Sequence, residues 1–155
     1  MIRMDKSNDN NLLESIRLRD ISNYSEENGH LIFIEGTNDI YFSIERVFVV
    51  YASLGQIRGQ HAHKECSQFL VCLHGEVVVK CNDGKSSSMF LLKNPTQGIL
   101  IPPGIWAEQV YKEENSILMV LCDREYNEGD YIRDFNEFLL FTKNLLNVQD
   151  ENRNG

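Results

Sequence analysis

Residues 55–75 read GQIRGQHAHKECSQFLVCLHG and carry the strongest structural signal in this chain. Two β-rich runs, QIRGQHAH at 56–63 and QFLVCL at 68–73, are flanked by glycines that favour turns. In an extended strand, residues two apart share a face, so His61 and His63 project to one side while Ala62 points to the other. If that side is the interior of a closed sheet, two imidazoles line one pocket.

The same pattern continues on both sides of this stretch. Short runs of β-branched and aromatic residues, bounded by Gly, Pro, Asn and Asp, predict further strands near 31–35, 42–51, 76–81, 87–92, 98–102, 106–111 and 117–122. Gly75 and Gly84 stand where tight hairpins need a positive φ, which predicts hairpins at 73–76 and 82–85. A jelly-roll barrel leaves few exposed edges, so we expect this all-β architecture.

The end of the chain changes period. After Asp134, a plausible N-terminal cap, apolar residues recur at helical spacing and predict a short C-terminal helix: Phe135, Phe138, Leu139, Leu145 and Leu146. Residues 1–11 and 147–155 are polar without apolar periodicity, so we expect two flexible ends around a single domain at 12–146.

Residues 42–51 are apolar at nearly every position beyond Arg46, which predicts a strand covered on both faces. A second layer or a second subunit would provide that cover. Together with the Phe stripe of the final helix, this run predicts a homodimer.

Composition restricts the partners. The 155 residues include 15 Lys and Arg against 23 Asp and Glu, a formal charge of -8, which argues against nucleic acid or an acidic membrane as a partner. No apolar window is long enough to span a membrane. The four cysteines form no CxxC pair, which suggests reduced structural thiols in a cytoplasmic protein. A phosphate-bearing small ligand remains compatible with the charge, because a few arginines suffice to bind it.

The chain resembles the cupin superfamily, whose first motif is G-x5-H-x-H-x3-4-E-x6-G. This motif is matched by Gly55, His61, His63, Gln68 and Gly75. The second motif, G-x5-P-x-G-x2-H-x3-N, is approximated by Gly98, Pro102, Gly104 and Trp106. Gln68 replaces the usual glutamate and Ala107 the usual histidine, so two of four metal ligands are missing. Two histidines alone would hold a divalent metal weakly, so we expect no metal.

A narrower resemblance covers residues 28–138. The elements FSIERV (42–47), RGQHAHK (58–64), PPGIWAE (102–108) and YNEGDYIR (126–133) are similar to the nucleotide-sugar 3,4-ketoisomerases, cupin enzymes that act on dTDP-4-keto-6-deoxyglucose. The resemblance implies that His61 removes the C3 proton and returns it at C4, and that His63 relays protons between the sugar oxygens. It also implies no cofactor, a cytoplasmic role in making 3-amino sugars, and a homodimer with exchanged N-terminal strands.

Six further residues are candidates for substrate binding: Arg46, Tyr51, Arg58, Gln68, Trp106 and Glu108. Arg46 and Arg58 suit the diphosphate. Arg58 has the wrong strand parity to share the face of His61, unless Gly59 marks a β-bulge. Trp106 and Glu108 share a face of one strand and either could border the sugar.

Three alternatives stay open. A nucleotide-sugar 3,5-epimerase has R-G-x-H without the second histidine, so the presence of His63 argues against this enzyme class. A sugar-binding cupin without catalysis would leave the C3 proton in place, and a metal-dependent oxygenase lacks ligands. Ala107 and Asn28 stand where relatives carry larger side chains, so both C4 configurations of the product, galacto and gluco, remain open.

Overall fold

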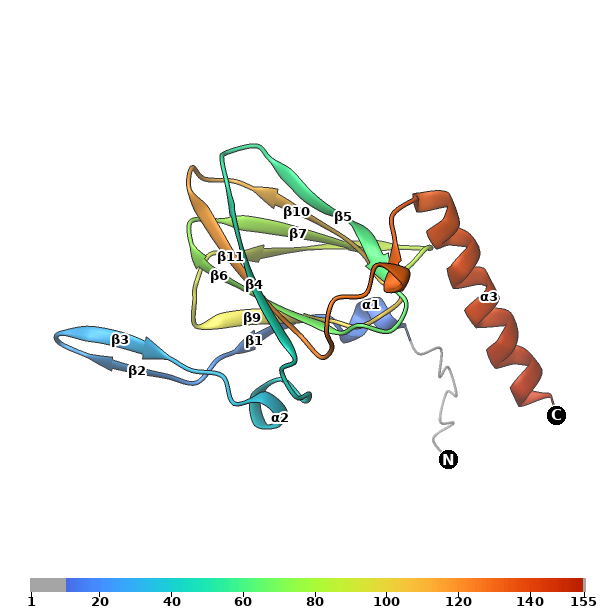
Figure 1. The fold of residues 1–155 in the computed structure, drawn as a ribbon, viewed down its shortest axis with the longest axis horizontal. Coiled ribbons are helices and arrows are strands. Elements are labelled where there is room, and N and C mark those ends of the chain that lie inside the picture. Colours follow the sequence, from blue (N-terminus) through green and yellow to red (C-terminus); the bar gives the residue numbers. More distant parts are fainter. Residues whose placement is uncertain (1–10, 155) are drawn as a thin grey trace, which may run out of the picture.

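The computed structural model describes residues 11–154, which fold into two five-stranded antiparallel sheets packed face to face (Figure 1). The first sheet has the order β1 (Leu18–Asp20), β9 (Gln97–Ile101), β6 (Gln68–His74), β11 (Ser116–Cys122) and β4 (Arg46–Ala52). The second has the order β12 (Tyr131–Ile132), β5 (Ile57–His63), β10 (Trp106–Tyr111), β7 (Val77–Asn82) and β8 (Ser87–Leu92). The predicted all-β jelly-roll barrel is confirmed.

The remaining elements are short, except for the last. They are α1 (Leu12–Ser15), the separate hairpin of β2 (Asn23–Glu26) and β3 (Gly29–Ile32), α2 (Gly36–Asp39), a 3-10 turn (Glu128–Asp130) and α3 (Phe135–Arg153). No helix in residues 11–154 is long and apolar enough to cross a membrane.

The main core lies between the two sheets. Side chains that alternate along β6, β7, β10 and β11 meet there, because residues two apart in a strand share a face. Representative members are Leu70, Val79, Tyr111 and Leu118, each at most 1% exposed. All four cysteines are buried and none forms a disulfide, as expected for structural thiols.

A second cluster covers the outer face of the first sheet. Ile40 and Phe42, from the segment that precedes β4, pack with Phe69, Val71 and Leu121 of the sheet. The β2–β3 hairpin, in contrast, extends away from the barrel with nearly all of its residues exposed (Figure 1).

The first turns of helix α3 pack against the outer face of the second sheet, and the rest of the helix runs on beyond the sheet (Figure 1). Asp134 caps it as predicted, because its side chain accepts a hydrogen bond from the Glu137 N–H at 2.9 Å. Trp106 on β10 contacts the rings of Phe135 and Phe138, with centroid distances of 5.2 and 5.7 Å. The helix continues to Arg153. It is therefore longer than predicted, and 147–153, which we expected to be part of a flexible tail, are helical; residues 1–10 and 155 lie outside the described residues.

The main strands were predicted within one or two residues, with particular exceptions. Residues 33–35 and 42–45 belong to connections, not to strands. The segment 73–76 is not a hairpin, because β6 and β7 lie in different sheets and Gly75 (φ 76°) turns the chain from one to the other. The hairpin at 82–85 is confirmed by the pairing of β7 with β8 and by Gly84 at φ 96°.

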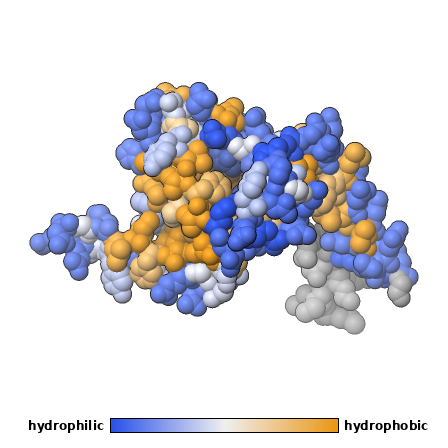
Figure 2. Space-filling view, viewed as in Figure 1, coloured by the Kyte–Doolittle hydropathy of each residue, from blue (hydrophilic) through white to orange (hydrophobic). Residues whose placement is uncertain are grey.

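Among residues 11–154, strand β4 is covered on one face only. Phe48 and Val50 pack into the core, whereas Val47, Val49 and Tyr51 are exposed by 53%, 41% and 74%. Figure 2 shows hydrophobic side chains gathered over the front of the sheets, where β4 crosses in Figure 1. The described part of one chain therefore does not supply the cover on both faces that we expected.

Candidate active site

A β-bulge in β5 determines which side chains share the barrel interior. Gly59 has φ 80° and Gln60 φ 55°, and the register with β10 shifts between Ala107, which opposes His61, and Glu108, which opposes Gly59. Ala107 belongs to the core between the sheets, so His61 faces the interior. Because of the bulge, Arg58 faces this same side.

His61 is held as a neutral base. Its Nδ1 lies 3.0 Å from the Gly59 carbonyl oxygen, which places the ring proton on Nδ1 and leaves the lone pair on Nε2. Burial, with a smaller contribution from nearby His63, lowers the pKa of His61 to about 4. The imidazole is therefore neutral at physiological pH and presents an unprotonated Nε2.

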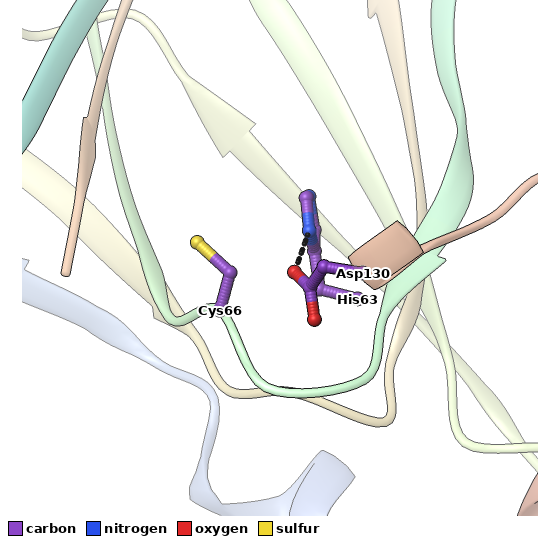
Figure 3. A group of neighbouring side chains, drawn as sticks. All are labelled: His63, Cys66 and Asp130. Carbon is purple, nitrogen blue, oxygen red and sulfur yellow. Dashed lines mark hydrogen bonds and ion pairs between the residues drawn. The ribbon is translucent and has the colours of Figure 1, made fainter. Parts of the chain in front are cut away.

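His63 forms a buried pair with Asp130, a residue from the 3-10 turn (Figure 3). The His63 Nδ1 lies 2.8 Å from Asp130 Oδ2, and both residues are over nine-tenths buried. Asp130 Oδ1 accepts a second hydrogen bond from the Glu65 N–H at 2.7 Å. Burial lowers the pKa of His63 despite the opposing effect of Asp130, so a neutral ring donates Nδ1–H to a carboxylate.

This pairing fixes the tautomer of His63. With its proton on Nδ1, the ring presents the lone pair of Nε2, a buried atom with no hydrogen-bond partner in the described part of the chain. The His61 and His63 rings lie 5.1 Å apart at right angles. Two imidazoles, both with an unprotonated Nε2, thus stand side by side.

Tyr131 completes the group. It opposes His63 in the pairing of β12 with β5, and its ring lies 5.0 Å from His61 and 4.4 Å from His63. Its hydroxyl lies 3.5 Å from Arg46 Nη2. The aromatic ring thus links the two histidines to a cation.

Arg46, Cys122 and Gln68 lie side by side on three neighbouring strands. Cys122 opposes Arg46 in the pairing of β11 with β4, and opposes Gln68 in the pairing with β6. Arg46 Nη2 and Gln68 Nε2 lie 3.4 and 3.5 Å from the Cys122 Sγ. The Arg46 guanidinium also lies between the rings of Phe48 and Tyr126, at 5.4 and 5.5 Å.

Of the eight residues predicted for the site, the structure places four in the interior and separates three from it: Arg46, His61, His63 and Gln68 face the interior. The register puts Arg58 on the same side through the bulge, but its side chain is exposed. Tyr51 does not face the interior, because it has the opposite parity to Arg46 on β4 and is exposed on the outer face.

Trp106 and Glu108 do share a face, but it is the outer one, opposite to Ala107. Trp106 Nε1 donates to Glu108 Oε1 at 3.3 Å beneath α3. Both residues line a pocket of about 480 Å³ between the second sheet and α3, with Phe135 among its other lining residues. Our expectation that Trp106 or Glu108 borders the sugar is therefore wrong for a sugar bound in the barrel interior. Strand alternation fixed which residues share a face but left open which face is interior.

Asp130, Tyr131 and Cys122 were missed as site residues. Asp130 and Tyr131 lie in YNEGDYIR (126–133), which the sequence singled out as a motif without assigning roles within it. Their distance in sequence from His63 hid the contact. Cys122 gave no signal, because a cysteine in an apolar run usually indicates core packing.

The four cupin metal positions do not fit a metal. Ala107 contributes a methyl group to the core, and the Gln68 amide donates to Cys122, so only His61 and His63 remain. A different group, His63, Cys66 and Asp130, has donor atoms within 4.8 Å of one another (Figure 3). The His63 Nδ1 and Asp130 Oδ2 of this group are already hydrogen-bonded to each other, and Figure 3 shows the Cys66 sulfur pointing away from both. This group therefore does not fit a metal either.

Comparisons with known proteins identify the family of this chain. Residues 14–143 match the family described as FdtA: WxcM-like, C-terminal. A curated relative from Aneurinibacillus thermoaerophilus, named TDP-4-oxo-6-deoxy-alpha-D-glucose-3,4-oxoisomerase, is 37% identical over 114 residues, which cover 73% of this chain and 82% of the relative.

Two solved structures are similar over most of their length. QdtA, a sugar 3,4-ketoisomerase from Thermoanaerobacterium thermosaccharolyticum in complex with TDP, has a TM-score of 0.82 at 32% identity, covering 85% of this chain and 97% of QdtA. WlaRB, a TDP-quinovose 3,4-ketoisomerase from Campylobacter jejuni, has a TM-score of 0.77 at 29% identity, covering 81% and 98%. This chain therefore belongs to the FdtA family, WxcM-like, C-terminal.

Proposed function

We propose that this protein is a 3,4-ketoisomerase that converts TDP-4-keto-6-deoxyglucose into a TDP-3-keto-6-deoxyhexose. The observation that carries the proposal is the pair of neutral, adjacent imidazoles of His61 and His63, each with Nε2 unprotonated. The substrate follows from the 37% identical relative, whose name contains this sugar nucleotide.

His61 acts as the base in this mechanism. A proton on C3, next to the C4 ketone, is acidic enough for a positioned imidazole to remove it. His61 Nε2 takes the C3 proton, and the electron pair moves to O4 to give an enediolate. Because the depressed pKa of His61 makes its protonated form a strong acid, the same ring returns the proton to C4.

His63 relays the proton between the two oxygens. The isomerisation needs a proton on O4 and the loss of a proton from O3, and it involves no net oxidation. His63 Nε2 accepts the O3 proton while Asp130 stabilises the charge that develops on the ring. The protonated His63 then delivers the proton to O4. Tyr131 packs against both histidines and orients their rings.

The diphosphate requires cationic donors in a protein of net charge -8. Arg46 faces the same interior as the histidines and the exposed Arg58 lies on the same side of the sheet, so we assign both to the diphosphate. We assign Gln68 to keeping Arg46 and Cys122 in register at this end of the sheet.

The second histidine favours an isomerase over a 3,5-epimerase. An epimerisation inverts single carbons and needs no proton relay between neighbouring oxygens, whereas His63 and its buried Asp130 provide one. A sugar-binding cupin without catalysis would leave the C3 proton untouched, so it is an outcome of the experiment below.

The protein is assigned as a homodimer. Val47, Val49 and Tyr51 form an exposed apolar row on the edge strand β4, and the β2–β3 hairpin projects with Tyr24 and Leu31 exposed by 67% and 58%. An isolated two-stranded hairpin is marginally stable, so it gains stability by packing on a second copy. An exchange of N-terminal strands between the two copies would cover both surfaces.

The product suits transamination at its new C3 ketone. This reaction takes place in the cytoplasm, where sugar nucleotides are made, and gives a 3-amino sugar for surface polysaccharide. Ala107 opposes His61, so its small side chain leaves space beside the base, and both C4 configurations of the product stay open.

A proton NMR time course with TDP-4-keto-6-deoxyglucose in D2O tests this function. We expect the C3 proton signal to disappear while a C4 signal of the 3-keto product, partly deuterated, appears. The coupling of that signal distinguishes galacto from gluco. An unchanged spectrum with bound ligand would support the non-catalytic alternative and refute the isomerase.

A further inference from the structure

No carboxylate of residues 11–154 forms an ion pair with the positively charged Arg46. Its Nη2 contacts the Cys122 sulfur and the Tyr131 hydroxyl, and its other close neighbours are the rings of Phe48 and Tyr126. Within residues 11–154, the ion pairs involve other residues. Its Nε is buried without a hydrogen-bond partner. In the substrate-free protein, a partly buried guanidinium without an anion is costly, and the Cys122 sulfur lies within hydrogen-bond distance of it.

The surroundings of the Cys122 sulfur suit an anion. Arg46 Nη2 at 3.4 Å and Gln68 Nε2 at 3.5 Å both donate hydrogen to it. The single hydrogen of the neighbouring Cys66 thiol is donated to the Ser67 carbonyl at 3.4 Å. A neutral Cys122 thiol would have its own hydrogen among these donors, whereas a thiolate accepts from both Arg46 and Gln68.

We propose that Cys122 is a thiolate that neutralises Arg46 and positions its guanidinium beside Tyr131. The pairing of the strands supports this assignment, because Cys122 lies opposite Arg46 on one side and opposite Gln68 on the other. The sulfur thus has a fixed place between the two donors, and Arg46 is held within reach of the histidines through Tyr131.

The hydrogen-bond donors around the sulfur act in the same direction. Interactions with Cys66, Arg46 and Gln68 lower the pKa of Cys122 against the effect of burial. The interaction with Cys122 and burial both raise the pKa of Cys66. Five titratable or charged groups surround the two cysteines and Arg46, or belong to them. They are Arg46 on β4, Cys66 in the loop before β6, Asp123 just after β11, His63 on β5 and Tyr131 on β12.

The thiolate is tested in the substrate-free protein by its ultraviolet absorption as the pH is raised. We expect one thiolate per chain at neutral pH, with a signal that Cys122→Ser removes. Arg46→Gln should move the midpoint upward by about 1–3 pH units, because it removes the nearby positive charge. Arg58→Gln is the matched control and should leave the midpoint unchanged. Cys81→Ser should keep the signal, since burial raises the pKa of Cys81 to about 12.

The positioning role rests on the proposed function and has its own readout. Cys122→Ser keeps a polar side chain but not the charge, so we expect the KM for the sugar nucleotide to rise about tenfold with a smaller change in kcat. The absorbance titration needs no substrate, so it separates the two proposals. If the wild-type protein shows the thiolate signal but does not isomerise the sugar nucleotide, the proposed ion pair stands and the proposed isomerase function is refuted.

Two results would overturn the proposed ion pair. One is a Cys122 signal that appears only in the alkaline range of an ordinary thiol. The other is a midpoint that Arg46→Gln does not shift. Both measurements use the folded full-length chain, and the wild-type titration requires no substitution.

Discussion

Asp130→Asn should separate C3 proton exchange from isomerisation. Asp130 accepts from the Glu65 N–H through Oδ1 and from His63 Nδ1–H through Oδ2. An asparagine has only one acceptor oxygen, and the Glu65 N–H would hold it in place. Its NH2 group would then face His63 Nδ1, so the ring proton moves to Nε2 and His63 can no longer accept a proton there.

The expected loss follows from this change of tautomer. General acid–base steps contribute about 10²–10⁴ in rate, and the same substitution in an Asp–His pair of a hydrolase costs about 10⁴ in kcat. We expect isomerisation to fall by roughly 10²–10⁴, while His61 still exchanges the C3 proton with D2O. Loss of the charge-assisted hydrogen bond should also destabilise the fold by about 1.5–3 kcal/mol.

A proton NMR time course measures exchange and isomerisation in one sample, and ¹⁵N chemical shifts of the histidines report the tautomer. Asp123→Asn is the matched control, because Asp123 binds the Ser67 N–H and Arg124 and not a histidine. The reasoning is refuted if Asp130→Asn isomerises within about twofold of wild type, a factor worth only about 0.4 kcal/mol.

Three other perturbations have definite outcomes. Because the pKa of His61 is lowered to about 4, its neutral form persists in mild acid. The rate of C3 proton exchange should therefore stay level from about pH 8 to 5.5. A tenfold fall in that rate would indicate a base of ordinary pKa near 6.5. Sedimentation should give a mass of about twice 17.9 kDa for wild type and a single-chain mass for Val49→Asp. Met89→Asp is the control, because Met89 is exposed on β8, and this variant should stay dimeric. A monomeric wild type would contradict the dimer. Phe138→Ala should lower the free energy of unfolding in urea by about 3–5 kcal/mol, since Phe138 is fully buried, and Leu140→Ala, 61% exposed, should cost far less; similar losses for both would show that α3 does not pack as described.

The sequence predicted the barrel because its strands are local patterns. The alternation and the turn residues of β6–β11 indicate their own strands without reference to the rest of the chain. The short elements β1, β2 and β12 were not predicted, since two to four residues carry no period and these strands depend on their partners. The turn at Gly75 was assigned to a hairpin because a positive φ serves a crossing between sheets equally well.

The site was predicted where chemistry and period coincide. His61 and His63 were found because two identical titratable residues share one strand face. Trp106 and Tyr51 were misplaced because parity says which residues face together but not which face is interior. Asp130 and Cys122 lie far from His63 and Arg46 in sequence, so their roles appear only when β12 and β11 pair with their neighbours.

Deuterium incorporation at C3 and C4 of TDP-4-keto-6-deoxyglucose, compared between wild type and His61→Asn in D2O, tests the central claim most directly. We expect wild type to lose the C3 proton and form the 3-keto product, and His61→Asn to bind the nucleotide sugar while leaving the C3 proton in place. Asparagine preserves a polar group of moderate size but cannot act as a base near neutral pH. Isomerisation by His61→Asn at a rate close to wild type would contradict the assignment of His61 as the base.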